Sequence, residues 1–227
     1  MPEDKAESRI KIYPETPHLI LCEGRDAYNF LIWLLVFLKN NDPVFNVFRV
    51  YDFGGITELK QYLSTLTKQD EFKRIVRSLC IIRDAETDAR SACQSIKGSL
   101  KNGGFAVPPK PCFRTANGSA KYPNIATGFI LFPSCDATPQ NGTLEDLCLQ
   151  ILAKEDAAKV LSDADAALKP YTERLPRLPK NRLHTYFSLT DDFVSWKLGE
   201  AARDKAFSFE APQIDSLKSF LLQMTGA

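Results

Sequence analysis

The sequence is poor in the residues from which several common kinds of site are built. Its two histidines, His18 and His184, are too few and too far apart to suggest a zinc site. Its six cysteines occur singly, without the paired spacing of a metal-binding motif. Two of them, Cys22 and Cys80, fall inside predicted strands, where a buried thiol is expected. Because no signal peptide is recognisable, we expect a reducing, cytoplasmic location.

Excess charge and long apolar runs are missing as well. A net charge of +1 excludes a broad electrostatic attraction to nucleic acid, although it leaves room for a local basic patch. The apolar run 30–38 is too short to span a bilayer, so it predicts a buried helix and no membrane partner. Since 227 residues are many for one domain and few for two, we expect one α/β core with appended helices.

Strands and helices are predicted to alternate three times in the first half of the chain. The predicted strands are 18–22, 45–51, 78–83 and 127–132, and the predicted helices of this half are 26–40, 58–66, 69–75 and 89–100. Such alternation with short connections indicates a parallel sheet with right-handed crossovers. We therefore expect a lead-in over 1–17, an α/β domain over 18–150 and a helical extension over 151–227 that packs on the same core.

Glycines or carboxylates follow each of the first three predicted strands. They are Glu23-Gly24, Gly54-Gly55 and the alternate acids Asp84, Glu86 and Asp88. Ligand sites in open parallel sheets form beyond the carboxyl ends of the strands, and neighbouring strands lie about 4.8 Å apart. The first acids of the two clusters, Glu23 and Asp84, are therefore placed to share one ion. Oxygen ligands without histidine or thiolate suit Mg²⁺ or Mn²⁺.

This order of motifs resembles the Toprim domain, the metal-binding module of topoisomerases, primases, recombination proteins and OLD-type nucleases. The resemblance covers roughly residues 18–150 and is clearest over 18–105. More narrowly, the segments 142–147 and 199–221 look like features of small stand-alone bacterial Toprim-like proteins whose function is unassigned. The resemblance implies an α/β fold with a mostly parallel, Toprim-like sheet of about four strands flanked by helices, a helical C-terminal extension, and Mg²⁺ or Mn²⁺ as cofactor.

The resemblance also assigns roles to the acids. It makes Glu23 a metal ligand or general acid/base, and Asp84 the first ligand of an Asp-x-Asp pair. Glu86 stands where the second aspartate usually stands, so either its longer side chain reaches the ion or Asp88 substitutes for it, unless Asp88 only caps the next helix. Glu145 matches a later acid that binds a second ion in OLD-type nucleases, and it is equally well explained as the N3 acid of a helix.

A basic run surrounds two prolines in the helical extension. It comprises Arg174, Arg177, Lys180, Arg182 and His184. Such a run usually forms a solvated face, but it can also supply phosphate-binding cations beside the acids. We take Lys180 as the candidate catalytic lysine.

Glycine backbone and arginine side chains make up the predicted phosphate site. Its candidates are Gly24, Arg25, Gly54, Gly55 and Arg182. The glycines let the backbone pass close to a ligand, and the helix N-termini beside them favour an anion. Arg25 is also explained by a surface ion pair. Arg83, which precedes Asp84, could neutralise the acid cluster; that alternative would make it part of a structural salt bridge and would argue against a metal.

Together these patterns predict a metal-dependent protein that processes phosphodiesters, most directly a Toprim-type nuclease acting on nucleic acid. The alternative is a non-catalytic Toprim-like module that binds a nucleic acid, a nucleotide or a protein partner. The altered acidic pattern and the near-neutral net charge favour this alternative. A protein partner or a homodimer is compatible with both hypotheses.

Overall fold

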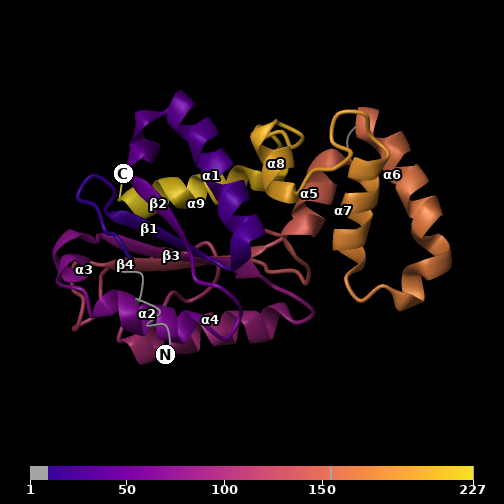
Figure 1. Ribbon diagram of the computed structural model, residues 1–227. Helices are drawn as coiled ribbons and strands as arrows, with labels where there is room; N and C mark the ends of the chain where they lie inside the picture. Colours follow the sequence, from indigo (N-terminus) through magenta and orange to yellow (C-terminus); the bar gives the residue numbers. More distant parts are fainter. Residues whose placement is uncertain (1–9, 154, 227) are drawn as a thin grey trace, which may run out of the picture.

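The computed structural model describes residues 10–153 and 155–226, so residues 1–9 of the expected lead-in lie outside the described residues. Its strands form one sheet in the order β2-β1-β3-β4, and every neighbouring pair is parallel (Figure 1). The strands are β1 (His18–Cys22), β2 (Phe48–Asp52), β3 (Ser78–Asp84) and β4 (Ala126–Phe132). The predicted α/β class with a four-stranded parallel sheet is confirmed.

The helices connect and cover these strands. They are α1 (Gly24–Asn41), α2 (Leu59–Thr67), α3 (Asp70–Ile75), α4 (Ala89–Gly103), α5 (Leu144–Leu152), α6 (Glu155–Leu168), α7 (Leu178–Ser188), α8 (Leu198–Arg203) and α9 (Asp215–Thr225), with 3₁₀ helices at Pro43–Val47, Lys169–Arg174 and Pro212–Ile214. The second strand starts at Phe48 and not at residue 45 as predicted. The reason is that Pro43 suits the first helical position and the Asp42 side chain accepts a hydrogen bond from the N–H of Val44, which starts a 3₁₀ turn.

Alternate residues of each strand face two separate apolar layers, because side chains in a strand point to opposite faces in turn. Ile20 of β1 and Ile82 of β3 belong to the layer formed with α1, α5, α8 and α9. Leu21 and Ile81 belong to the layer formed with α2, α3 and α4, and Figure 1 shows α2 and α4 beneath the sheet. The apolar run 30–38 is a buried part of α1, as predicted.

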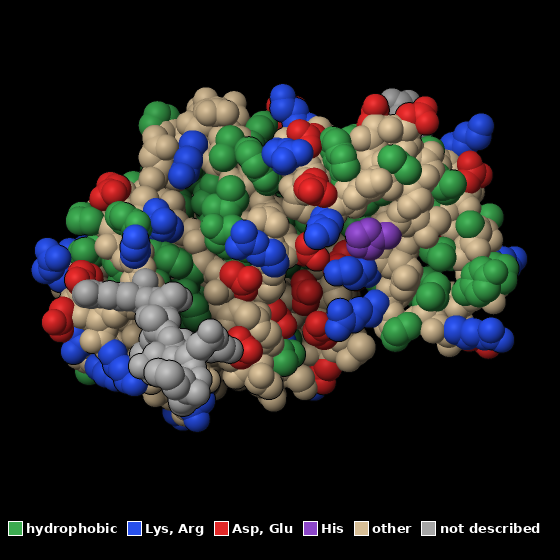
Figure 2. Space-filling model, viewed as in Figure 1, with side chains coloured by type: hydrophobic (Ala, Val, Ile, Leu, Met, Phe, Trp, Pro, Cys, Tyr) green, Lys and Arg blue, Asp and Glu red, His purple; other side chains and the backbone are tan. Residues whose placement is uncertain are grey.

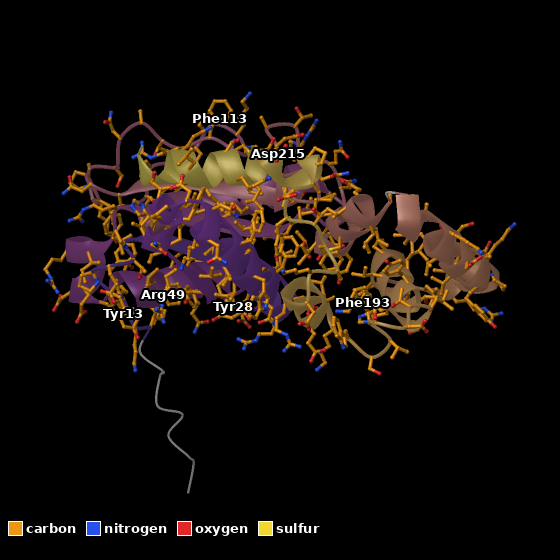
Figure 3. All side chains as sticks on the ribbon, turned by 90° about the horizontal axis from the view of Figure 1, so that it is seen from above. Tyr13, Tyr28, Arg49, Phe113, Phe193 and Asp215 are labelled. Atoms are coloured by element: carbon orange, nitrogen blue, oxygen red, sulfur yellow. The ribbon has the colours of Figure 1, made fainter. Side chains whose placement is uncertain are left out.

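The helical pair α6 and α7 lies beside the sheet and not over it. Figure 3 shows α9, which begins at Asp215, running across the sheet, while α6 and α7 extend to one side. The pair touches the rest of the protein mainly where α7 packs against α5. This packing brings residues 176–180 to the carboxyl edge of the sheet. Within the described part of the chain, no helix has the length and apolar character needed to cross a membrane.

Candidate functional site

A cleft of about 480 Å³ opens at the carboxyl ends of β1 and β3, between the sheet and the start of α7. Figure 2 shows acidic side chains in this hollow, with lysine and arginine side chains on its α7 side. Its acidic lining residues are Glu23, Asp26, Asp84, Glu86, Glu145 and Asp146, and its basic ones are Arg25, Arg177 and Lys180. The cleft therefore holds carboxylates from three separate parts of the chain. Arg177 and Lys180 come from a fourth part, and Arg25 comes from the same segment as Glu23.

Glu23 and Arg83 form a buried ion pair on the α2/α4 side of the sheet. The N–H of Glu23 donates to the carbonyl oxygen of Ile82 (3.1 Å), which continues β1 alongside β3 and makes the side chains of Glu23 and Arg83 neighbours. Nε of Arg83 lies 3.1 Å from Oε2 of Glu23, and the two side chains are 1% and 14% exposed. Burial raises the pKa of Glu23, and the Arg83 charge opposes that rise.

The hydrogen bonding of this pair is incomplete. Nε of Arg83 donates to the carbonyl oxygen of Asp84 (3.3 Å). Oε2 of Glu23 receives no hydrogen bond from any residue that the structure describes. The attraction between Glu23 and Arg83 is thus one of charge, and one buried carboxylate oxygen keeps its lone pairs available.

Asp84 lies on the opposite side of the sheet edge, because it follows Ile82 with the alternation of the strand. Its Oδ1 accepts a hydrogen bond from the N–H of Leu144, the first residue of α5 (2.9 Å). Burial and the nearby Glu145 carboxylate raise the pKa of Asp84 to about 8, and the Leu144 hydrogen bond opposes them. Near neutral pH this carboxyl group therefore holds a proton for much of the time unless a cation is close.

Of the two candidates for the second ligand of β3, the structure brings only Glu86 to the cleft. Glu86 has a φ of +56°, and its N–H and carbonyl exchange hydrogen bonds with Gly142 (2.8 and 2.7 Å). Asp88 instead caps α4, since its side chain accepts hydrogen bonds from the N–H and the hydroxyl of Ser91 (3.0 and 2.7 Å). Those two hydrogen bonds lower the pKa of Asp88. Asp88 is not among the described residues that line the cleft.

Glu145 and Lys180 meet across the cleft. Glu145 is the second residue of α5, and the N3 acid is Asp146, which forms a capping box with Thr143. The N3 explanation therefore applies to Asp146 and not to Glu145. Nζ of Lys180 lies 3.8 Å from Oε1 of Glu145 and 3.2 Å from Oδ2 of Asp26. The structure thus brings the candidate lysine to the acids.

The two predicted phosphate-binding arginines lie in different places. Arg25 lines the cleft, and its guanidinium lies 4.7 Å from the ring centre of Tyr28, which Figure 3 labels. Arg182 pairs through both side-chain nitrogens with Asp165 of α6 (2.5 and 2.7 Å), and it is not among the described residues lining the cleft. Arg177, which the sequence analysis named only as a member of the basic run, lines the cleft instead.

The glycines after β1 and β2 have a structural role in the loops that follow these strands. Gly24 and Gly54 have φ of +82° and +88°, which other residues rarely adopt. Their N–H groups both donate to Oδ1 of Asp52, at 3.0 and 2.8 Å. Asp52 therefore ties the two loops together, and the N–H groups of both glycines bond a carboxylate of the protein itself. Gly55 also lines the cleft.

Comparison with protein-family models matches residues 17–226 to the family described as Protein of unknown function (DUF3226). The chain belongs to this family. No curated protein and no solved structure matches the chain. The DUF3226 match runs from the start of β1 through α9, so it includes both the acids at the sheet edge and the cations at the start of α7.

The fit of a metal ion to the cleft depends on how many ligands it needs. Over residues 10–153 and 155–226, no group of three or more His, Cys, Asp or Glu side chains is arranged to hold an ion. Mg²⁺, however, keeps several waters and is commonly held by only one or two carboxylates together with substrate phosphates. Asp84 and Glu145 both line the cleft, and burial together with the charge of Glu145 raises the pKa of Asp84. These two carboxylates are therefore the ones that could hold such an ion.

Proposed function

We propose that the cleft binds hydrated Mg²⁺ or Mn²⁺ at Asp84 and Glu145 and that the protein hydrolyses phosphodiester bonds in nucleic acid. The observation that carries this proposal is the environment of Asp84. Burial and the Glu145 charge raise its pKa to about 8, so the folded protein maintains a costly pair of acids on one side of a cleft. Side chains with such strongly shifted pKa values in clefts are candidates for function. The resemblance to Toprim nucleases supports the same reaction.

The role of each side chain in this proposal follows from its position in the cleft. Glu23 is suited to hold or release a proton, because burial raises its pKa while Arg83 keeps the side chain in place. Lys180 and Arg177 face the acids from α7, where they can contact the non-bridging oxygens of a phosphate. Glu86 adds negative charge at the exposed rim of the cleft. A bound divalent ion would supply charge stabilisation and a more acidic water.

Cleavage assays test this proposal directly. The protein is incubated with supercoiled plasmid and with single-stranded DNA and RNA, with Mg²⁺, Mn²⁺ or EDTA. We expect metal-dependent cleavage that falls by at least about 100-fold in Asp84→Asn and in Glu23→Gln. Asp88→Asn is the matched control, because it makes the same change in the same loop but outside the cleft, and it should keep full activity. Equal activity in Asp84→Asn and the wild type contradicts the proposal.

One observation favours the alternative, a non-catalytic module that binds a nucleic acid, a nucleotide or a protein. The Arg83 guanidinium already lies 3.1 Å from Glu23 and neutralises one acid of the cleft without any metal. Thermal stabilisation by Mn²⁺ separates the two functions. A shift in melting temperature at micromolar Mn²⁺ that disappears in Asp84→Asn favours the metal-dependent enzyme. No shift at millimolar Mn²⁺ favours the binding module.

A further inference from the structure

We infer that Arg83 limits the cleft to a single divalent cation, because it acts as the permanent counter-ion of Glu23 and leaves only the Asp84 side open to a metal. This inference rests on the proposed function, since it assumes that the cleft binds a cation. It adds how many ions the cleft holds and why Glu23 is kept free of metal.

The first step concerns the faces of the sheet. The register pairs Cys22 with Ile82, so Glu23 and Arg83 are the next neighbours and point to the same face. Asp84 comes one residue later on β3 and points to the other face, toward the layer that contains α5. The two acids that follow β1 and β3 thus have different surroundings, although both line the same cleft.

The second step concerns how firmly each cation is held. The Arg83 side chain is only 1% exposed, and its Nε also donates to the carbonyl oxygen of Asp84. The Lys180 side chain, which approaches Glu145, is 40% exposed and lies 3.8 Å away. A buried guanidinium fixed in a strand cannot move aside for an incoming ion, whereas an exposed lysine on a flexible stem can.

The third step concerns charge repulsion. Mg²⁺ binds carboxylate oxygens at about 2.1 Å. An ion on Oε2 of Glu23 would therefore lie within about 5 Å of Nε of Arg83, a like charge in a poorly solvated place. At Asp84 the bound neighbour is the N–H of Leu144, a neutral donor. A divalent ion is thus favoured on the Asp84 side and repelled from the Glu23 side.

The consequence is a division of roles between the two acids. Two-ion phosphodiesterases place both metals about 3.5–4 Å apart and clamp the attacking and leaving oxygens. Arg83 excludes the second ion here, so Glu23 stays available for hydrogen bonding and proton transfer at the edge of the cleft. Arg83 is accordingly a positioning residue, because it acts through Glu23.

Counting bound Mn²⁺ ions tests this inference independently of any activity. Isothermal titration and electron paramagnetic resonance should find one Mn²⁺ per wild-type chain. Glu23→Gln should leave the dissociation constant within about threefold, while Asp84→Asn should weaken it by about 10- to 100-fold. In Arg83→Met a second ion should bind, and it should be lost again in the double variant Glu23→Gln/Arg83→Met. The double variant removes both charges of the pair together, so it remains informative if Arg83→Met alone does not fold.

The outcomes separate the inference from the proposed function. Two ions in the wild type, or equal losses of affinity in Glu23→Gln and Asp84→Asn, overturn the single-ion inference and leave the proposed metal site standing. A double variant that binds two ions also overturns the inference. If the wild type binds no Mn²⁺ at millimolar concentration, both the inference and the metal-dependent function fail.

Discussion

The two acidic sides of the cleft differ in how the charge of their carboxylate is compensated. On the Glu23 side, a partly buried carboxylate faces the fixed charge of Arg83 at 3.1 Å. On the Asp84 side, a partly buried carboxylate lies near a second acid, Glu145, and has a peptide N–H as its partner. The difference arises from one residue of offset along β3, which turns Arg83 and Asp84 to opposite faces. A parallel sheet edge can thus place a neutralised acid and an uncompensated acid beside each other.

The largest change in stability is expected from replacing Arg83, the fixed cation beside Glu23. Arg83→Met leaves the Glu23 charge buried without a partner, so the free energy of unfolding should fall by about 3–5 kcal/mol at pH 8. The loss should shrink toward pH 5, because Glu23 becomes protonated more readily once the charge that lowers its pKa is gone. Urea unfolding at both pH values measures the change. Glu23→Gln/Arg83→Met should recover most of the stability, and a double variant as unstable as Arg83→Met would show that the pair is not the cause.

The second-largest change in stability is expected at Asp84. The pKa of Asp84 rises from 3.8 to about 8 on folding, so the folded state binds more protons between these values and the stability of the metal-free protein should fall as the pH rises through this window. Asp84→Asn should remove that dependence and stabilise the metal-free protein at pH 8, by on the order of 2 kcal/mol once relaxation around the site is allowed for. Urea unfolding across this pH range checks it. An unchanged pH dependence in Asp84→Asn would contradict the assignment.

A smaller effect is expected at Asp88, which follows Asp84 of β3 by four residues and is not among the described residues that line the cleft. Asp88→Ala removes the side-chain cap of α4, so the melting temperature should fall by about 2–4 °C. The stabilisation by Mn²⁺ should stay as in the wild type. A loss of that stabilisation would place Asp88 in the metal site and remove the distinction between Asp84 and Asp88.

The smallest effect on stability is expected at Lys180, the exposed cation of the Asp84 side. Lys180→Met should change the melting temperature by less than about 2 °C, because exposed ion pairs contribute little. Mn²⁺ should bind slightly more tightly, since a competing charge near Glu145 is gone, while cleavage should slow. Titration with Mn²⁺ and single-turnover cleavage measure the two changes. Weaker Mn²⁺ binding in Lys180→Met would contradict the view that Lys180 gives way to an ion.

The sheet and the gathering of acids at its carboxyl edge could be predicted from the sequence because the signals were local. Short apolar runs that end at Glu23 and Asp84 indicated strands whose ends meet at one edge. The face to which each acid points could not be predicted, because strands buried on both faces carry no alternation of polar and apolar residues. The sequence therefore suggested one ion shared by Glu23 and Asp84, whereas the structure places the two acids on different faces.

The helical part of the site shows another limit. The basic run around the prolines indicated Lys180, which does line the cleft, but also Arg182, which pairs with Asp165 on α6. Residues two apart on a helix point in nearly opposite directions, while residues three apart share a side. That spacing favours Arg177 as the companion of Lys180, so the helical period was the signal that could have found it. Because α5 and α7 are far apart in the sequence, no local pattern predicts that they pack against each other.

The hydrogen bonds between the loops after β3 and β4 restrict how the chain length can vary. Glu86 pairs with Gly142 through two backbone hydrogen bonds, and Asn141 bonds both the carbonyl of Thr87 and the N–H of Ala89. The N–H that reaches Asp84 comes only two residues after Gly142. An insertion or deletion among residues 134–140 would leave these bonds in register, whereas one between residues 141 and 144 would present a different N–H to Asp84. Natural variation in loop length within this family should therefore concentrate before Asn141.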